Sequence, residues 1–147
     1  MNSINKPSGS FIFASWIAFL SGVSAFLLGL WNADMELNEK GYYFTLLIFG
    51  LFSAISLQKS VRDRLENIPV TGTYFGICWF SFFTAITLLA VGLWNADMLL
   101  SEKGFYAISF LLSLYASISV QKNIRDMVYS PSDDIDLVVV NPESNIE

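Results

Sequence analysis

The chain has 147 residues, of which 54% are hydrophobic and only 14% are charged, whereas about a quarter of the residues in an ordinary soluble domain carry charge. Its mean hydropathy is +0.52 and its formal net charge is −5, which excludes an ordinary soluble domain and a basic nucleic-acid-binding protein. It has no histidine and one cysteine, Cys78, so neither a disulfide framework nor a cysteine–histidine metal site can form within one chain.

Four long runs of the sequence contain no charged residue. A helix needs roughly 17–25 apolar residues to cross a hydrocarbon core of about 30 Å. We therefore predict membrane-spanning helices near Phe11–Trp31, Gly41–Leu57, Tyr74–Trp94 and Gly104–Val120. The second and fourth runs are short, and flanking Lys and Arg side chains that reach toward the headgroups would extend them.

The first run follows an N-terminal segment of residues 1–10. It is longer than the apolar part of a secretory signal, and no small-residue cleavage site follows it, so we interpret it as a retained span. Small residues recur along this run at one-turn spacing: Ala14, Ala18 and Gly22, with a neighbouring row of Ser21, Ala25 and Gly29. Small residues let helices approach closely in lipid, which predicts a packing face.

The second run follows a polar loop that contains W-N-A-D-M. Asn38 is a favourable N-cap for the second helix, and Glu39 places negative charge at the positive end of its dipole. We predict that this helix continues beyond the apolar run to about Leu65, before Ile68-Pro69 ends it. Its predicted packing residues are Gly50 and Ala54.

The third and fourth runs repeat the first two. The segment from Gly29 to Asp63 recurs without a gap from Gly92 to Asp126, identical at 19 of 35 positions with a fixed offset of 63. Ser101 therefore takes the predicted N-cap position of Asn38, and Ser113 and Ser117 take the packing positions of Gly50 and Ala54. Both hairpins cross the membrane in the same sense, as a parallel duplication about a pseudo-two-fold axis along the membrane normal.

The last segment, residues 130–147, is acidic and rich in Ser, Pro and Asn, which predicts a disordered tail. Within it, the run 135–140 could alternatively add to the sheet edge of a partner. The predicted organisation is an N-terminal segment (1–10), a first two-helix hairpin (11–66), a second hairpin (67–129) and this tail. The fold class is all-α: an integral membrane four-helix bundle built from two tandem transmembrane hairpins.

Lys and Arg residues in the short loops predict the orientation. Six of them, Lys6, Lys59, Arg62, Arg64, Lys122 and Arg125, belong to the N-terminal segment, the middle loop and the start of the tail. The two other loops carry only Lys40 and Lys103. Because the excess faces the cytoplasm, we predict that both termini are cytoplasmic (N-in/C-in) and that both W-N-A-D-M loops lie outside.

Polar residues cluster twice in register around these two loops. The candidate residues are Asn32, Asp34, Glu39, Lys40, Asn95, Asp97, Glu102 and Lys103. One interpretation is a pseudo-symmetric outer site whose paired carboxylates hold a divalent cation, which prefers oxygen ligands. The favoured interpretation is structural: these residues turn the chain and cap the next helix. In a third, Asp34 or Asp97 pairs with the Lys of the other hairpin.

A second doubled cluster stands at the opposite helix ends. Gln58-Lys59 and Gln121-Lys122 are followed by Arg62-Asp63 and Arg125-Asp126. These residues could contact anionic lipid headgroups or a cytoplasmic protein. Ordinary positive-inside anchoring is the simpler interpretation, and we favour it.

The four runs contain no Asp, Glu, Lys, Arg or His, and such residues usually mark ion pathways and proton relays. Hydroxyl groups on Ser53, Ser56, Thr84, Thr87, Ser109, Ser113, Ser117 and Ser119 could line a polar route or join helices. Nucleophile–base pairs, metal-ligand spacing and phosphate-binding glycine loops do not emerge either. The chain is therefore predicted to be neither an enzyme nor a binder of a cofactor or metal.

The leading hypothesis is a non-catalytic membrane protein that acts through assembly with itself or with another membrane component. Its expected partners are the lipid bilayer, a second copy or another membrane protein, and not nucleic acid. The alternative is a channel or facilitator for a small solute. A minor third hypothesis is a role in envelope stress or lipid contact.

The doubled block resembles a known family. The pattern G-L-W-N-A-x-M-x-L-x-E-K-G-Y-Y at Gly29–Tyr43, its echo at Gly92–Tyr106 and the Q-K-x-V/I-R-D endings are similar to the YiaA/YiaB family of small bacterial inner-membrane proteins. The resemblance covers roughly Phe11 to Asp126, with both copies of the two-helix domain. It implies a four-helix protein of the bacterial inner membrane, and it brings no biochemical activity or functional residue.

Overall fold

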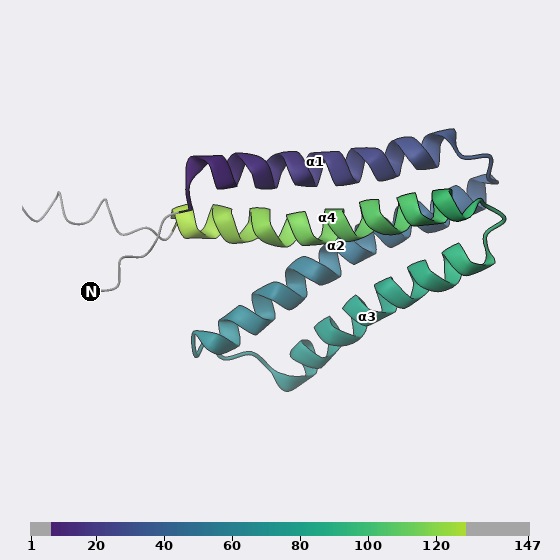
Figure 1. The fold of residues 1–147 in the computed structure, drawn as a ribbon. Helices are drawn as coiled ribbons and strands as arrows, with labels where there is room; N and C mark the ends of the chain where they lie inside the picture. The colour runs from purple at the N-terminus through teal and green to yellow at the C-terminus, as the bar shows by residue number, and fades with distance from the viewer. Residues whose placement is uncertain (1–6, 129–147) are drawn as a thin grey trace, which may run out of the picture.

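Four helices make up the computed structural model, which describes residues 7–128 (Figure 1). They are α1 (Gly9–Asn32), α2 (Leu37–Leu65), α3 (Gly72–Asn95) and α4 (Leu100–Val128). Each is long and apolar enough to cross a membrane, so the all-α class and the four predicted spans are confirmed. The predicted tail, with its run 135–140, lies outside the described residues.

The helix ends follow local sequence signals. The Ser8 side chain caps α1 by accepting a hydrogen bond from the Phe11 N–H at 3.3 Å. Helix α2 ends at Leu65 as predicted, and Asn67 then adopts a left-handed conformation with φ of 59°. Asn is one of the few residues that tolerate this conformation, and Pro69 follows it, so the turn into α3 is encoded locally.

The predicted N-caps Asn38 and Ser101 are wrong. Helix α2 already begins at Leu37 after Glu36, and α4 begins at Leu100. The Glu39 carboxylate accepts a hydrogen bond from the Glu36 N–H at 3.1 Å, and Glu102 does the same for the Leu99 N–H at 3.0 Å. A glutamate three residues after the cap satisfies a free N–H by reaching back, and this interaction moves the helix start two residues upstream.

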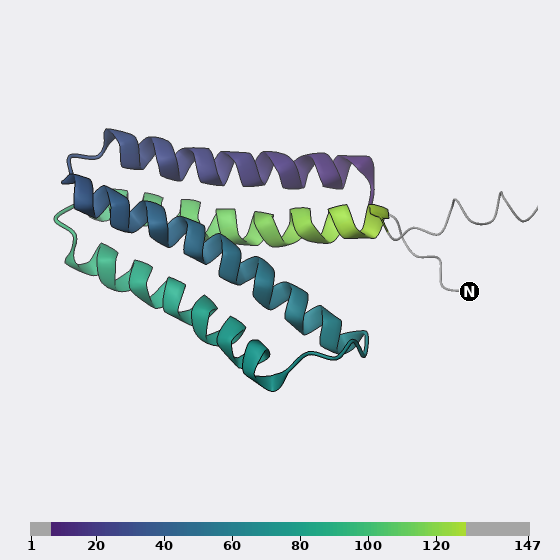
Figure 2. The same cartoon turned by 180° about the vertical axis from the view of Figure 1, so that it is seen from behind.

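The helices pack in an order that differs from their order in the chain. Helix α1 packs antiparallel to α4, α3 packs antiparallel to α2, and α2 and α4 meet in the middle. The two helices of each sequence hairpin touch each other only slightly. Figures 1 and 2 show α4 and α2 between α1 and α3 from both sides. The packing therefore lies mainly between the two repeats.

The buried positions repeat with the sequence. The buried residues of α1 are Ser15, Gly22, Phe26 and Leu30, and those of α3 are Cys78, Ala85, Leu89 and Leu93, each 63 positions later. Helices α2 and α4 bury more residues than α1 and α3 because each has neighbours on both sides. This equivalence agrees with the pseudo-two-fold duplication.

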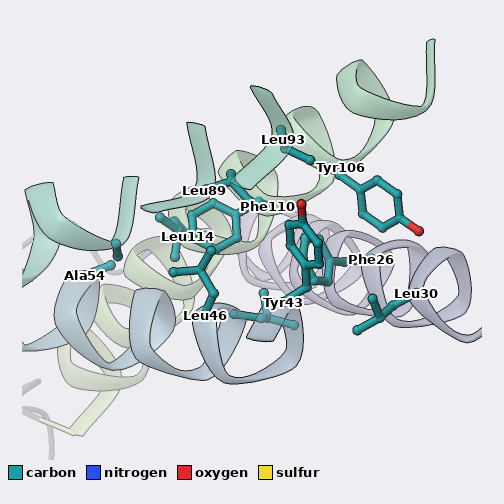
Figure 3. Packing of buried hydrophobic residues seen from close by; sticks show 12 residues of the cluster. Phe26, Leu30, Tyr43, Leu46, Ala54, Leu89, Leu93, Tyr106, Phe110 and Leu114 are labelled. Carbon is teal, nitrogen blue, oxygen red and sulfur yellow. The ribbon is translucent and has the colours of Figure 1, made fainter. Parts of the chain in front are cut away.

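Aromatic side chains from three helices pack against one another in the hydrophobic core (Figure 3). Phe26 and Phe110 are 0% exposed. Tyr106 lies edge-on to Phe26 with ring centroids 5.5 Å apart, and it stacks on Tyr43 at 6.2 Å. These rings join α1, α2 and α4 into one hydrophobic core.

Close approach of the helices involves some of the small residues named in the sequence, whereas Ala14 and Ser21 of the predicted rows are exposed. A Cβ atom added at Gly22 would lie 2.8 Å from Ser113 Oγ, and one added at Gly50 would lie 2.6 Å from Phe110 Cζ. At Gly29 it would lie 2.6 Å from Phe105 Cε1. Ala54 and Ser117 are buried, and Ala25 is half-buried. These contacts lie within one chain, a point that the sequence left open.

Candidate functional site

All eight predicted polar residues lie at one end of the bundle, at or beside the α1–α2 and α3–α4 connections, which we call the hairpin-loop end. The opposite end, where α2 turns into α3 and α4 ends, is called the terminal end. Six of the eight side chains bond to the backbone in matching ways. Each of these hydrogen bonds therefore occurs once in each repeat.

The asparagines and lysines bond carbonyl groups near the C-terminal ends of α1 and α3. Asn32 Nδ2 donates to the Leu28 carbonyl at 2.7 Å, and Asn95 Nδ2 donates to the Val91 carbonyl at 2.8 Å. Lys40 Nζ donates to the Trp31 carbonyl at 3.2 Å. Lys103 Nζ does the same for the Trp94 carbonyl at 3.3 Å. The Trp31 and Trp94 carbonyls are among the last four of their helices, which have no partner in their own helix, so the two lysines stabilise the ends of α1 and α3.

The lysine bonds contradict one of the three interpretations. Each lysine bonds a carbonyl of its own hairpin, so neither Asp34 nor Asp97 pairs with the lysine of the other hairpin. Since Glu39 and Glu102 cap α2 and α4, six of the eight residues have structural partners. Asp34 and Asp97 are exposed, and neither side chain has a hydrogen bond or ion pair with any described residue.

Two cavities of about 370 and 330 Å³ lie at the hairpin-loop end. Every residue that lines one cavity has its repeat equivalent, 63 positions away, in the lining of the other. Four residues line both cavities: Asp34, Met35, Asp97 and Met98. The two aspartates without partners therefore lie on the wall that the two cavities share.

The cavities differ at only two equivalent positions. Asn38 and Tyr42 line the smaller cavity where Ser101 and Phe105 line the larger one. The Tyr42 hydroxyl donates to the Leu88 carbonyl of α3 at 2.7 Å, a bond that the ring of Phe105 cannot make. The sequence analysis did not predict that four further residues of the same doubled block line the cavities: Met35, Met98, Tyr43 and Tyr106.

The geometry gives little support to a metal site. Within residues 7–128, no group of three or more His, Cys, Asp and Glu residues comes together to hold a metal ion. A divalent cation in a protein usually takes six or more oxygen ligands, several of them from carboxylates or carbonyls. The hairpin-loop end is instead a pair of mixed polar and apolar cavities with a shared acidic wall.

Four of the eight hydroxyl groups that could line a polar route donate to carbonyls of their own helices. Ser53 Oγ donates to the Phe49 carbonyl at 2.8 Å, and Ser117 Oγ donates to the Leu114 carbonyl at 2.7 Å. Ser113 Oγ donates to the Ser109 carbonyl at 2.7 Å, and Ser109 Oγ donates to the Phe105 carbonyl at 2.8 Å. All four serines are buried between packed helices, which is how Ser and Thr join helices in lipid.

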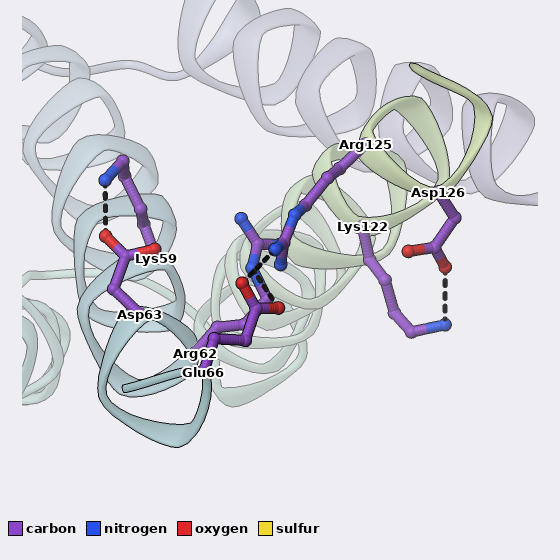
Figure 4. A network of polar contacts seen from close by, with 7 residues as sticks. All are labelled: Lys59, Arg62, Asp63, Glu66, Lys122, Arg125 and Asp126. Carbon is purple, nitrogen blue, oxygen red and sulfur yellow. Dashed lines mark hydrogen bonds and ion pairs between the residues drawn. The ribbon is translucent and has the colours of Figure 1, made fainter. Parts of the chain in front are cut away.

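The terminal end carries charged side chains from α2 and α4 (Figure 4). Lys59 pairs with Asp63, and Lys122 pairs with Asp126 at 3.1 Å, each within one helix. Glu66 receives two arginines: Arg62 of its own helix at 4.0 Å and Arg125 of α4. Next to this cluster, buried Asn123 Nδ2 donates to Ser15 Oγ of α1 at 3.1 Å. The cluster links the two repeats.

Comparison with known proteins gives one family and three relatives. The model of the yiaA/B two-helix domain matches residues 11–63 and again residues 74–126. The inner membrane protein YiaA of Escherichia coli (strain K12) is 55% identical over 130 residues, which cover 88% of this chain and 90% of the relative. No solved structure matches the chain.

The two other relatives are more distant. The uncharacterized membrane protein YubF of Bacillus subtilis (strain 168) is 44% identical over 59 residues, which cover 40% of this chain and 68% of YubF. The inner membrane protein YiaB of Escherichia coli (strain K12) is 26% identical over 102 residues, which cover 69% of this chain and 87% of YiaB.

Proposed function

The chain belongs to the yiaA/B two-helix domain family, and from this premise we propose that it is a non-catalytic inner-membrane protein. It acts by assembling with a second copy or another membrane protein at its hairpin-loop end. Its inner-membrane relatives and four apolar helices make it a multi-pass inner-membrane protein. The assembly surface is the pair of equivalent cavities with their shared wall of Asp34 and Asp97.

One observation carries this proposal. Six of the eight polar residues around the loops already bond to the backbone, so only Asp34 and Asp97 remain available for a partner. Exposed carboxylates without partners cost little in water but recognise a donor group strongly once water is excluded. A partner that covers both cavities would bury these two carboxylates against its own N–H or cationic groups.

Co-purification in mild detergent, followed by measurement of the complex mass, tests the proposal. We expect the wild-type chain to appear with a second copy or another membrane protein. The double variant Asp34→Asn with Asp97→Asn should lose this partner. The control Asp133→Asn with Asp134→Asn removes the same charge from the tail and should retain it. A strictly monomeric wild-type chain with no partner contradicts the proposal.

We further propose that both termini lie in the cytoplasm and that the paired cavities face the opposite side. Six basic residues near the terminal end against two near the loops support this orientation, by the positive-inside rule. A reporter fused after Glu147 that is active only in the cytoplasm is the expected result. Reporter activity on the periplasmic side would reverse the orientation.

The channel alternative has weaker support. Phe26, Phe110 and the stacked tyrosines pack between α1, α2 and α4, and the buried serines bond their own helices. A route through one chain would have to displace these rings. Reconstituted vesicles that show no flux for a broad panel of small solutes would remove the alternative, whereas flux lost in the Asp34→Asn and Asp97→Asn double variant would restore it.

A further inference from the structure

The two cavities at the hairpin-loop end carry negative charge without a basic residue in their walls. Asp34 and Asp97 belong to both linings, and each cavity adds one glutamate, Glu102 in the larger and Glu39 in the smaller. Neither lining contains a lysine or an arginine. The lysines of the two loops bond helix carbonyls and lie outside both linings. Each cavity therefore presents three carboxylates to a ligand that enters it.

A buried tyrosine in each cavity has a hydroxyl group without a partner. Tyr43 is 5% exposed and lines the smaller cavity, and Tyr106 is 4% exposed and lines the larger one. Both rings pack in the hydrophobic core (Figure 3), but neither hydroxyl has a hydrogen bond with any residue of 7–128. Buried polar groups without partners are rare. A ligand in the cavity would supply the bond that each hydroxyl lacks.

Glycines keep the space beside these hydroxyl groups open. A Cβ atom added at Gly29 would lie 3.4 Å from the Tyr106 hydroxyl, and one added at Gly92 would lie 3.3 Å from the Tyr43 hydroxyl. Each glycine lines the same cavity as its tyrosine. Each hydroxyl therefore lies beside a part of the cavity wall that has no side chain, and the arrangement occurs once in each repeat.

The polar groups of the walls favour a ligand that donates hydrogen bonds. Carboxylates only accept hydrogen bonds, and a tyrosine hydroxyl can accept as well as donate. An ammonium group is complementary, because it has a positive charge, three donors and no acceptor. Within residues 7–128, the carboxylates do not converge in a group of three that could hold a metal ion. The walls therefore fit an organic cation better than a metal ion.

Each cavity also provides apolar surface for the rest of such a ligand. Tyr42 and Tyr43 set their rings at 79° with centroids 5.2 Å apart in the smaller cavity. Phe105 and Tyr106 set theirs at 77° with centroids 5.7 Å apart in the larger one. Aromatic faces attract cations, and their carbon atoms also pack against an alkyl chain.

We propose that each cavity is a binding site for a small primary amine in its ammonium form. The ammonium group donates hydrogen bonds to the carboxylates and to the free tyrosine hydroxyl, and the alkyl chain lies against the aromatic rings. Small-molecule sites usually have volumes of about 300–1,000 Å³, a range that includes both cavities. The site shares its end of the protein with the proposed assembly, but it depends only on walls within one chain and needs no partner.

Thermal unfolding of the purified full-length chain in a neutral detergent tests the site, because a bound ligand stabilises the folded state. Sodium chloride keeps the ionic strength equal in all samples. Butylammonium should raise the unfolding midpoint, and 1-butanol, which has the same alkyl chain without the charge, should not.

Tyrosine variants locate the bound amine. Tyr43→Phe with Tyr106→Phe removes only the two hydroxyl groups and should bind butylammonium roughly tenfold more weakly, the loss expected for hydrogen bonds to a charged group. The matched control Tyr74→Phe with Tyr115→Phe removes two hydroxyl groups outside both linings. It should keep the wild-type affinity.

Tetramethylammonium separates hydrogen bonding from charge attraction, because it has the same charge as butylammonium but no N–H group. It should raise the midpoint less than butylammonium does in the wild-type chain. Its effect should be the same in the wild-type chain and in Tyr43→Phe with Tyr106→Phe.

Three results would overturn the proposal. Butylammonium could fail to raise the midpoint of the wild-type chain. Magnesium chloride or tetramethylammonium could match butylammonium, which would show general charge attraction. The tyrosine double variant could keep the full affinity, which would place the amine outside the cavities.

The oligomeric state of the same samples distinguishes this proposal from the assembly. A monomeric wild-type chain that binds butylammonium would contradict the assembly and support the amine site. A wild-type complex that does not respond to butylammonium would support the assembly and overturn the amine site.

Discussion

At the residue scale, the two helix pairs place the smaller residue of a contact on opposite partners. Gly22 of α1 lies against Ser113 of α4, whereas the same two repeat positions hold Ala85 and Gly50 in the other pair, α3 and α2. The polar pair Asn123 and Ser15 likewise has the equivalents Ser60 and Cys78. The copies have therefore become complementary and no longer match each other at these positions.

The change Gly22→Ala tests this complementarity. The new methyl group would lie 2.8 Å from Ser113 Oγ and 3.0 Å from Ser113 N, and overpacking of this kind costs about 1–3 kcal/mol. Adding Ser113→Gly should restore part of the loss, because it recreates the Ala and Gly of the other pair. The measurement is thermal unfolding in detergent. Gly76→Ala is the control and should not destabilise the chain, because the new Cβ would meet no atom of another helix within 4 Å.

The start of α2 gives a second residue-scale prediction. Because Glu39 accepts the Glu36 N–H, Glu39→Ala should destabilise the protein by about 0.5–2 kcal/mol, the usual cost of a lost cap. Asn38→Ala should have little effect, since Asn38 lies inside the helix. The measurement is the free energy of unfolding of both variants at equilibrium. A larger loss of stability for Asn38→Ala than for Glu39→Ala would support Asn38 as the N-cap, as the sequence predicts.

At the element scale, the repeat boundaries do not coincide with the packing units. Each hairpin joins two helices whose main neighbours belong to the other hairpin. Hydrogen bonds also cross between the repeats: Asn123 reaches Ser15, 108 residues away, and the Tyr42 hydroxyl reaches the Leu88 carbonyl, 46 residues away. The helix pair, one helix from each repeat, is the packing unit.

Disulfide crosslinking measures this pairing. In a Cys78→Ser background, Ser15→Cys with Asn123→Cys should form a bridge on mild oxidation, because these two side chains are in contact between α1 and α4. The pair Ser15→Cys with Ser60→Cys places the thiols on the two helices of one hairpin and should stay reduced. Mass tagging of free thiols after denaturation reads out both. A bridge only in the second pair would mean that the hairpin is the packing unit.

At the scale of the whole molecule, neither repeat can bury its apolar faces alone. The core residues Phe26, Tyr43, Tyr106 and Phe110 come from both repeats, and Arg125 of the second repeat pairs with Glu66 at the end of α2. Both cavities at the hairpin-loop end also take their walls from both repeats. The two halves therefore depend on each other for stability and for the candidate site.

Division of the chain in the α2–α3 connection tests this dependence. Residues 1–66 and 72–147, expressed together as separate chains, should co-purify, because the packing between the repeats does not require the covalent link. Each half expressed alone should accumulate poorly. Separate accumulation of stable, monomeric halves would show instead that each hairpin is a self-sufficient unit.

The sequence by itself determined the number of spans, the tandem repeat, the all-α class and the end of α2. Each of these depends on local properties: the length of an apolar run, the spacing of charges and the chemistry of Asn67 and Pro69. The helix starts differ from those that Asn38 and Ser101 predict, because Glu39 and Glu102 reach back to cap a residue farther upstream.

Only the tertiary structure decided which helices are neighbours and which polar side chains remain available. Asn32, Lys40 and Glu39 are as polar in sequence as Asp34, and only the folded loop shows that they bond to backbone groups while Asp34 does not. Helix pairing in lipid depends on the fit between surfaces that lie far apart in the chain. The fit of Gly22 to Ser113 arises only when the two repeats fold against each other.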